Sequence, residues 1–197
     1  MPNYEVIAAA SETLRDVLKT AMTDAGLDVD VELDDLQFDP PFSNPTLTIF
    51  LFEIGEDPSA RNRPRVRETN PPNLTIRKPP VALVLRYLLT AWRGQAAADQ
   101  QTPQKILGQA IHVLYNKAIL SGPDLQGVLK GTDEALKVTM SPLSLEDRTR
   151  VFNAVQKAYR LSVSYEVRAV NIDSEEGPEF KPVARRSVSF DESEAGS

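Results

Sequence analysis

"TLTIFLFEI", residues 46–54, is apolar on both faces of the strand that it predicts. Its side chains alternate between two sets: Leu47, Ile49 and Leu51 on one face, and Phe50, Phe52 and Ile54 on the other. Successive side chains of a strand point to opposite faces of a sheet, so both faces of this strand require cover. A strand of this kind is expected in the middle of a sheet with helices packed against it.

Other periodic segments surround this strand. Apolar residues at strand spacing predict further strands at 28–36, 80–92, 134–140 and 159–172. Apolar stripes at helical spacing predict helices at 4–25, 103–120 and 144–158. These segments must bury one another's apolar faces, which predicts an α+β fold: a single mixed, mostly antiparallel β-sheet flanked by about three helices, with an extended C-terminal arm.

The sequence predicts two parts. Residues 1–173 form an α/β domain, which contains a long loop rich in proline and arginine at 55–80. Residues 174–197 are polar, with strand propensity only in "SVSF" (187–190), and are interpreted as a flexible arm outside the core. The loop is expected to lack a continuous helix or strand ladder because of six prolines: Pro58, Pro64, Pro71, Pro72, Pro79 and Pro80.

The composition excludes several classes of site. The chain contains no cysteine, which excludes disulfides, thiolate zinc sites and cysteine nucleophiles and fits a reducing compartment. Its single histidine, His112, is interpreted as a structural or surface residue because metal ligands come in sets. The sequence carries neither a phosphate-binding loop nor a nucleophile elbow. We therefore expect no enzyme, no cofactor and no metal.

Targeting signals are also missing from the pattern. The N-terminus lacks a basic stretch followed by an apolar run. No apolar segment reaches the ~20 residues that are needed to span a bilayer. The longest candidate, residues 80–92, carries Arg86 near its centre. The sequence predicts a cytoplasmic protein without a membrane span.

"EDPSARNRPRVRE", residues 56–68, places an arginine at every second position, Arg61, Arg63, Arg65 and Arg67, in a chain of formal net charge -6. Nucleic acid is one candidate partner, but the stretch has no interleaved aromatic residues for base stacking. Arginine is also enriched at protein interfaces, where it binds carboxylates through two hydrogen bonds. On these grounds three interpretations stay open: a protein interface, a solvated loop, or contact with a polyanion.

Several segments taken together resemble a known family. They are "ARNRP" (60–64), "LVLRYLLTAW" (83–92), "QKILGQAIHVL" (104–114), "KVTMSPLSLEDRTRVFNAV" (137–155) and "YRLSVSYEVRAV" (159–170). In this order they resemble the tail terminator, or cap, protein of extracellular-type contractile injection systems, which are phage-tail-like particles of bacteria. The resemblance extends over roughly residues 5–173.

The resemblance implies a homohexameric ring that ends the inner tube and the contractile sheath and joins them at the end distal to the baseplate. The implied partners are other copies of the chain, the inner tube protein and the sheath protein, with no nucleic acid, and the protein would assemble into a phage-tail-like particle. An acidic body with a basic loop supplies both signs of charge for the head-to-tail contacts of a ring.

Two interfaces are expected on these grounds. Arg61, Arg63, Arg65 and Arg67 are expected to contact acidic surface on a neighbouring cap subunit or on the tube. "ARRSVSF" (184–190), with Arg185, Arg186, Val188 and Phe190, is expected to exchange as a strand with the sheath. The alternatives are a tail-completion or head–tail joining protein of a phage and, from another class, a nucleic-acid-binding module that uses the arginine loop.

Overall fold

The computed structural model describes residues 4–34, 42–60, 66–70, 73–77, 80–95, 99–172 and 179–180. The chain divides into two units, residues 1–62 with 80–173 and residues 63–79 with 174–197. Each unit contains its own sheet.

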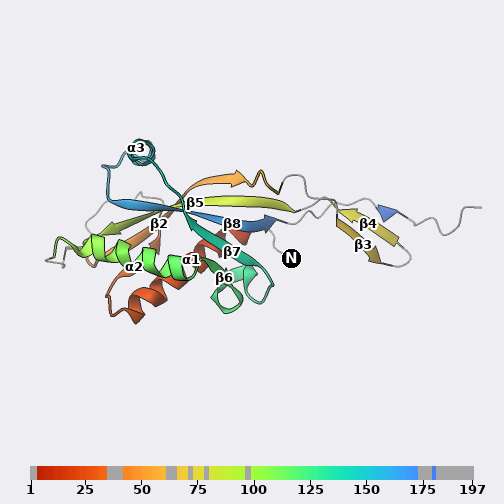
Figure 1. Cartoon of the computed structure of the whole chain (residues 1–197), viewed down its shortest axis with the longest axis horizontal. Helices are drawn as coiled ribbons and strands as arrows, with labels where there is room; N and C mark the ends of the chain where they lie inside the picture. Colours follow the sequence, from red (N-terminus) through yellow and green to blue (C-terminus); the bar gives the residue numbers. More distant parts are fainter. Residues whose placement is uncertain are drawn as a thin grey trace, which may run out of the picture. The chain divides into compact units, whose positions relative to one another are not determined.

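The larger unit is built on a six-stranded sheet of strand order β1-β2-β5-β8-β7-β6 (Figure 1). β1 pairs with β2 in parallel, and the other neighbouring strands pair antiparallel. The sheet is therefore mixed and mostly antiparallel, as predicted. Its strands are β1 (Asp30–Leu33), β2 (Thr46–Glu56), β5 (Val81–Trp92), β6 (Ile119–Ser121), β7 (Ala135–Met140) and β8 (Ser162–Ile172).

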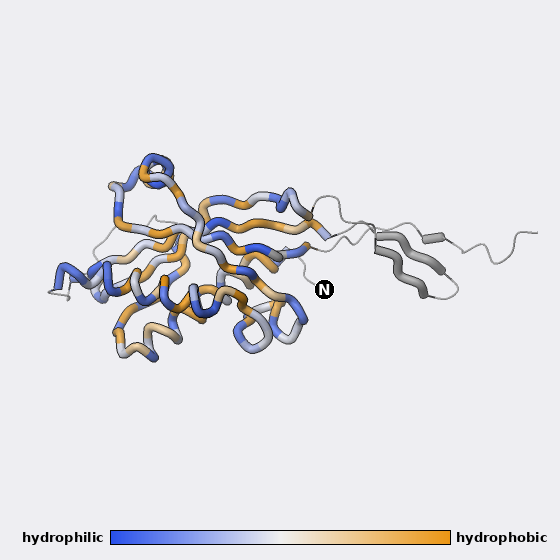
Figure 2. The backbone as a smooth tube through the Cα atoms, in the orientation of Figure 1, coloured by the Kyte–Doolittle hydropathy of each residue, from blue (hydrophilic) through white to orange (hydrophobic). Residues whose placement is uncertain are grey.

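Two helices, α1 (Val6–Asp24) and α2 (Thr102–Asn116), pack on one face of this sheet. Alternate residues of the strands point toward them, and Figure 2 shows apolar segments on the facing sides of helices and sheet. Burying each large apolar side chain stabilises the fold by roughly 1.5–3 kcal/mol. The largest buried side chains of this core include Leu14, Leu18, Met22, Leu47, Ile49, Leu85, Tyr87, Leu89 and Ile106.

The opposite face carries the third helix, α3 (Leu145–Ala154), and a smaller apolar cluster. Phe152 of α3 packs there with Leu88 and Trp92 of β5. The Trp92 indole Nε1 donates a hydrogen bond of 2.9 Å to Thr48 Oγ1, which satisfies a buried donor. Ser144 caps the N-terminus of α3, since its Oγ accepts a hydrogen bond of 3.0 Å from the Asp147 amide.

The smaller unit contains a three-stranded sheet of β3 (Val66–Asn70), β4 (Asn73–Arg77) and β9 (Glu179–Phe180). β3 and β4 form an antiparallel hairpin, with Asn70 opposite Asn73. The prediction that the prolines of residues 55–80 exclude a strand ladder is therefore wrong. Pro71 and Pro72 fall between the two strands and Pro79 follows them, so no proline interrupts the ladder.

Two other boundaries differ from the prediction. The helix predicted at 103–120 ends at Asn116, because the Ala118 carbonyl accepts a hydrogen bond of 2.8 Å from the Val138 amide and the next residues form β6. β2 lies second from the edge of the sheet rather than in its middle. Only Thr46–Ile49 of β2 pair with β1, and among the described strands the rest of β2 pairs with β5 alone.

Candidate interface surfaces

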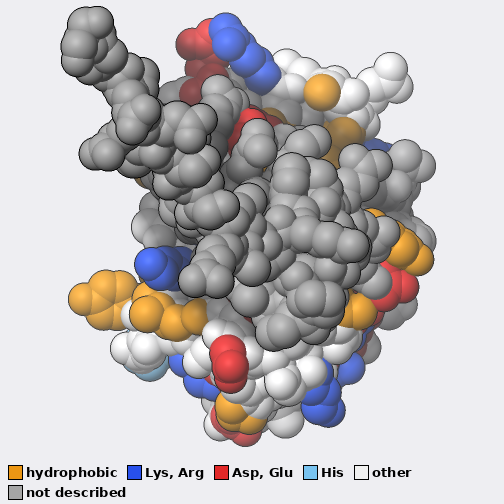
Figure 3. Space-filling model, turned by 90° about the vertical axis from the view of Figure 1, so that its right-hand side faces the viewer, with side chains coloured by type: hydrophobic (Ala, Val, Ile, Leu, Met, Phe, Trp, Pro, Cys, Tyr) orange, Lys and Arg blue, Asp and Glu red, His pale blue; other side chains and the backbone are white. Residues whose placement is uncertain are grey.

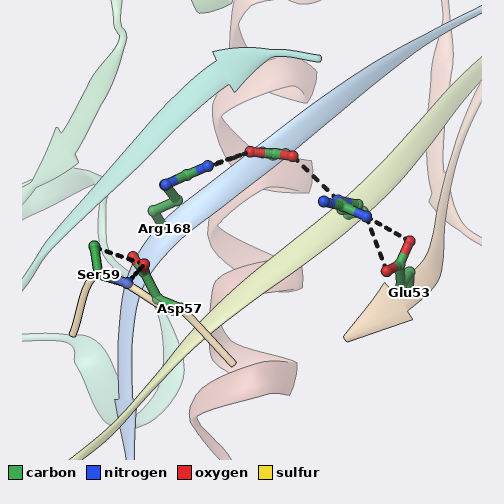
Figure 4. A network of polar contacts seen from close by, with 6 residues as sticks. Glu53, Asp57, Ser59 and Arg168 are labelled. Carbon is green, nitrogen blue, oxygen red and sulfur yellow. Dashed lines mark hydrogen bonds and ion pairs between the residues drawn. The ribbon is translucent and has the colours of Figure 1, made fainter. Parts of the chain in front are cut away.

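The arginine segment begins where β2 ends, at a turn closed by Asp57. Asp57 Oδ1 accepts hydrogen bonds from the Ser59 amide (2.9 Å) and the Ser59 hydroxyl (2.6 Å), as Figure 4 shows. The Asp57 amide donates to the Ala82 carbonyl at 2.8 Å, which fixes the turn to β5. An Asp side chain that binds the amide two residues on is a local turn former. The chain therefore leaves the sheet at a fixed point just before Arg61.

The predicted interface residues lie mostly outside the described residues. Arg61, Arg63 and Arg65 fall there, as do Arg185, Arg186, Val188 and Phe190. Arg67 lies on β3 with its backbone opposite Ile76. Whether the arginines act together, and whether residues 184–190 pair as a strand, therefore stay predictions.

A row of charged side chains that the sequence analysis did not identify crosses the face of the sheet that carries α3. We call it the charge row; it consists of Glu53 on β2, Arg86 on β5, and Glu166 and Arg168 on β8. Arg86 Nη1 donates to both Glu53 oxygens at 2.8 Å, and Arg86 Nε donates to Glu166 Oε1 at 3.1 Å. Arg168 Nη2 donates to Glu166 Oε2 at 2.9 Å (Figure 4).

Neighbouring groups of the charge row stabilise the ionised forms of Arg86 and Glu166. The hydrogen bond to Glu53 raises the pKa of Arg86, although burial opposes this. Burial alone would raise the pKa of Glu166, but hydrogen bonds from Arg168 and Arg86 outweigh it, and the pKa is lowered. Arg86 and Glu166 are therefore charged at neutral pH. The row presents alternating charges on a partly exposed sheet face.

One sequence signal pointed toward the charge row. Arg86 stands in an otherwise apolar strand, where an unpaired charge would be costly. Its partner Glu53 follows a β-bulge between Leu51 and Glu53, which moves Glu53 opposite Arg86. Because a β-bulge arises from the pairing of two strands, the sequence of either strand alone does not predict it.

A polar pair lies inside the core. Tyr87 Oη and Ser11 Oγ lie 2.8 Å apart beneath α1, beside a hollow of about 480 Å³ near the end of β1. Burial raises the pKa of Tyr87 to about 12, and the hydrogen bond with Ser11 offsets this only in part. The phenol therefore stays protonated at neutral pH and serves as a satisfied buried polar group.

The described ranges contain neither a metal-binding cluster nor a membrane-spanning helix. Within those ranges, no group of three or more His, Cys, Asp or Glu side chains is arranged to hold a metal ion. None of the helices that the structure describes is long and apolar enough to cross a membrane.

Two solved structures share this fold. The sheath/tube terminator of an extracellular contractile injection system, PVC, in its extended state, matches 97% of this chain with a TM-score of 0.67 and 20% identity. The tube-terminating cap of the anti-feeding prophage matches 96% with a TM-score of 0.60 and 23% identity. The chain spans 65% and 62% of the lengths of these two proteins.

The family is shown by a separate comparison. No curated protein is similar to this sequence at a significant level. Residues 9–186, most of the chain, match the family described as the Pvc16 N-terminal domain. The resemblance seen in the sequence is confirmed, and the chain belongs to the Pvc16 N-terminal domain family.

Proposed function

We propose that this chain is a structural cap of a phage-tail-like contractile injection particle, where it ends the inner tube and the sheath and joins them. The observation that carries the proposal is the fold shared with a sheath/tube terminator over 97% of the chain. The role is structural rather than enzymatic, which agrees with structural neighbours that are a terminator and a cap. Assembly in the cytoplasm is part of the same proposal.

Labelling tests this function directly. Epitope-tagged copies would be expressed with the particle genes, and purified particles would be stained with gold-conjugated antibody. Gold at one end of each tube, opposite the baseplate, is the expected result. Gold along the tube or at the baseplate would contradict the proposal. The phage head–tail joining and nucleic-acid-binding alternatives are not favoured, because both structural neighbours are caps or terminators of injection particles.

The cap acts as a ring of identical copies, with six as the proposed number. Head-to-tail contacts in a ring require two complementary patches on each copy. The arginines at 61, 63, 65 and 67 supply a basic patch on a chain of net charge -6. They contact acidic surface on a neighbouring copy or on the tube. Reversing two of them (Arg63→Glu and Arg65→Glu) is expected to abolish tube capping, and normal particle length in that variant would refute the contact.

The C-terminal segment joins the cap to the sheath. Residues 184–190, which include Arg185, Arg186, Val188 and Phe190, combine β-propensity with a polar tether, as strand exchange requires. Deleting residues 178–197 should leave tubes that are capped while the sheath is loose at that end. A truncated protein that still holds the sheath normally would rule this role out.

A further inference from the structure

A groove runs along the outer side of the helical layer, where α1 and α2 lie side by side. Gln109 Nε2 of α2 donates a hydrogen bond of 3.3 Å to the Ala21 carbonyl of α1 and ties the helices together. Two hollows, of about 310 Å³ and 170 Å³, share the lining residues Ala21, Asp24, Val113 and Lys117. They therefore form one continuous depression, which we call the α1–α2 groove.

The groove is acidic, and one of its carboxylates has no cationic partner in the described part of the chain. Asp16 is held by Arg15 at 2.9 Å and Asp124 by Lys117 at 3.0 Å. Asp24 forms no ion pair with any residue that the structure describes. It is also the last residue of α1, whose final turn carries no basic side chain. A carboxylate at the negative end of a helix dipole is unfavourable, so this position favours a cation from elsewhere.

α2 and the strand that follows it also expose apolar side chains outside the two hollows. Tyr115 of α2 is 82% exposed and Ile119 of β6 is 58% exposed. Figure 3 shows apolar side chains gathered beside the histidine on this side of the molecule, and His112 lines the groove. Arginine suits a groove lined by carboxylates, because its planar guanidinium binds carboxylate oxygens through two N–H groups.

We propose that the α1–α2 groove binds the arginine segment, residues 61–67, of a second copy of this chain. The inference rests on the proposed ring and names the acidic surface that the arginines contact. An extended segment places every second side chain about 7 Å apart, so three alternating arginines span about 13 Å. Asp16 and Asp24 are eight residues apart on α1, a distance of about 12 Å along the helix axis. The spacing of the cations therefore fits the spacing of the carboxylates.

The rival acidic surface is the edge strand β1. Glu32 is exposed there, and Asp30 accepts a hydrogen bond of 3.2 Å from Asn44 Nδ2. Glu32 lines neither hollow of the groove. Asp24 lines both hollows and Asp16 lines one of them, so an arginine segment that enters the groove can reach two carboxylates. The groove is therefore the better acceptor.

Cross-linking between copies tests the inference without removing any charge. The chain has no native cysteine, so each introduced thiol is unique. Copies with Thr20→Cys, an exposed groove position, are mixed with copies carrying Asn62→Cys inside the intact arginine segment. Particles assembled from the mixture are then treated with a short bismaleimide. A cross-linked dimer between the two kinds of copy is expected, and Glu32→Cys copies serve as the matched control.

The outcomes separate this inference from the proposed function. Capped particles that cross-link at least fivefold more through Thr20→Cys than through Glu32→Cys support it. If capped particles cross-link equally or preferentially through Glu32→Cys, the arginine segment does not bind in the α1–α2 groove, and the proposed capping function is unaffected. Tubes that are capped without this chain refute the function itself.

Charge reversal provides a second readout. Asp24→Lys places a cation at the C-terminal end of α1, where it favours the helix, so the monomer keeps or raises its Tm. Ring formation, measured by native mass spectrometry of material released from particles, should fall at least tenfold. Combining it with Arg63→Glu should restore at least part of the loss. Rings that form normally in Asp24→Lys, or fail equally in Glu32→Lys, contradict the inference.

Discussion

The two faces of the six-stranded sheet differ in the interactions that stabilise them: mainly apolar burial on one face, and a small apolar cluster with ion pairs on the other. The face under α1 and α2 is a continuous apolar core to which both helices and all six strands contribute. The opposite face has a small buried cluster of Leu88, Trp92 and Phe152, and beside it the charge row. Apolar burial is the dominant stabilising term, while exposed ion pairs contribute ~0–1 kcal/mol each. The first face therefore holds the fold, and the second is free to carry surface charge.

Shortening a buried side chain of α1 should destabilise the protein more than any other change considered. Leu14 is fully buried in the larger core, so Leu14→Ala loses transfer free energy and leaves a cavity. The free energy of unfolding should fall by about 2–5 kcal/mol in urea denaturation. Lys19→Ala, on the exposed side of the same helix, is the control and should change it by less than about 0.5 kcal/mol. Equal effects would deny that this face holds the fold.

Shortening the buried side chain of α3 should destabilise mainly α3 and its surroundings. Phe152→Ala removes the only fully buried side chain that α3 contributes among the described residues. We expect a loss of about 3 kcal/mol, at the lower end for a buried Phe because the cluster is small, with amide protection lost in α3 but kept in α1 and β5. Hydrogen exchange measures this, and the fluorescence of the single tryptophan, Trp92, reports on the same cluster. Loss of protection throughout α1 would mean that the two faces unfold together.

Alkaline pH should probe the first face selectively. The pKa of buried Tyr87 is raised to about 12. A raised folded-state pKa gives stability that is complete below the unfolded pKa, near 10, and is lost as pH rises toward 12. The free energy of unfolding should fall by about 1.4 kcal/mol per pH unit in this window from Tyr87 alone.

The Tyr87→Phe variant should lack this component of the alkaline slope. Tyr115→Phe, at an 82% exposed position, is the control and should keep it. Identical slopes in wild type and Tyr87→Phe would show that the buried phenol is not the group being titrated.

The charge row should give the smallest effect. The Arg86 side chain is 39% exposed, so Arg86→Gln should cost only about 0.5–1 kcal/mol at neutral pH. The lowered pKa of Glu166 means that its ionised form stabilises the fold at neutral pH and that this contribution is lost as pH falls through the folded-state pKa. Acid unfolding of the variant should therefore begin at a higher pH. If Arg86→Gln lowered the free energy of unfolding by more than about 3 kcal/mol, the charge row would be a major contributor to the stability of the fold.

Long periodic patterns allowed the fold class to be predicted, and short or paired features did not. All three helices and every strand of the larger sheet except β6 lie near their predicted positions. β6 has only three residues, too few for a period to show. β3 and β4 are short strands between prolines, and a proline-rich pattern predicts an interrupted ladder.

The candidate surfaces were harder to predict, for the same physical reason. The arginine segment is evident because its charges alternate along one stretch of chain. The charge row joins residues 53, 86, 166 and 168, which come together only through strand register and one β-bulge. The α1–α2 groove depends on two helices that are about 90 residues apart in sequence, as the 88-residue separation of Gln109 and Ala21 shows.

The central claim is that this chain ends the tube and sheath of an injection particle. The most direct measurement is the tube-length distribution, by electron microscopy, of particles from cells that lack this gene and from the same cells complemented with it. The account predicts overlong, uncapped tubes or absent particles in the deletion, and uniform capped particles after complementation. Capped particles of normal length in the deletion strain would contradict it.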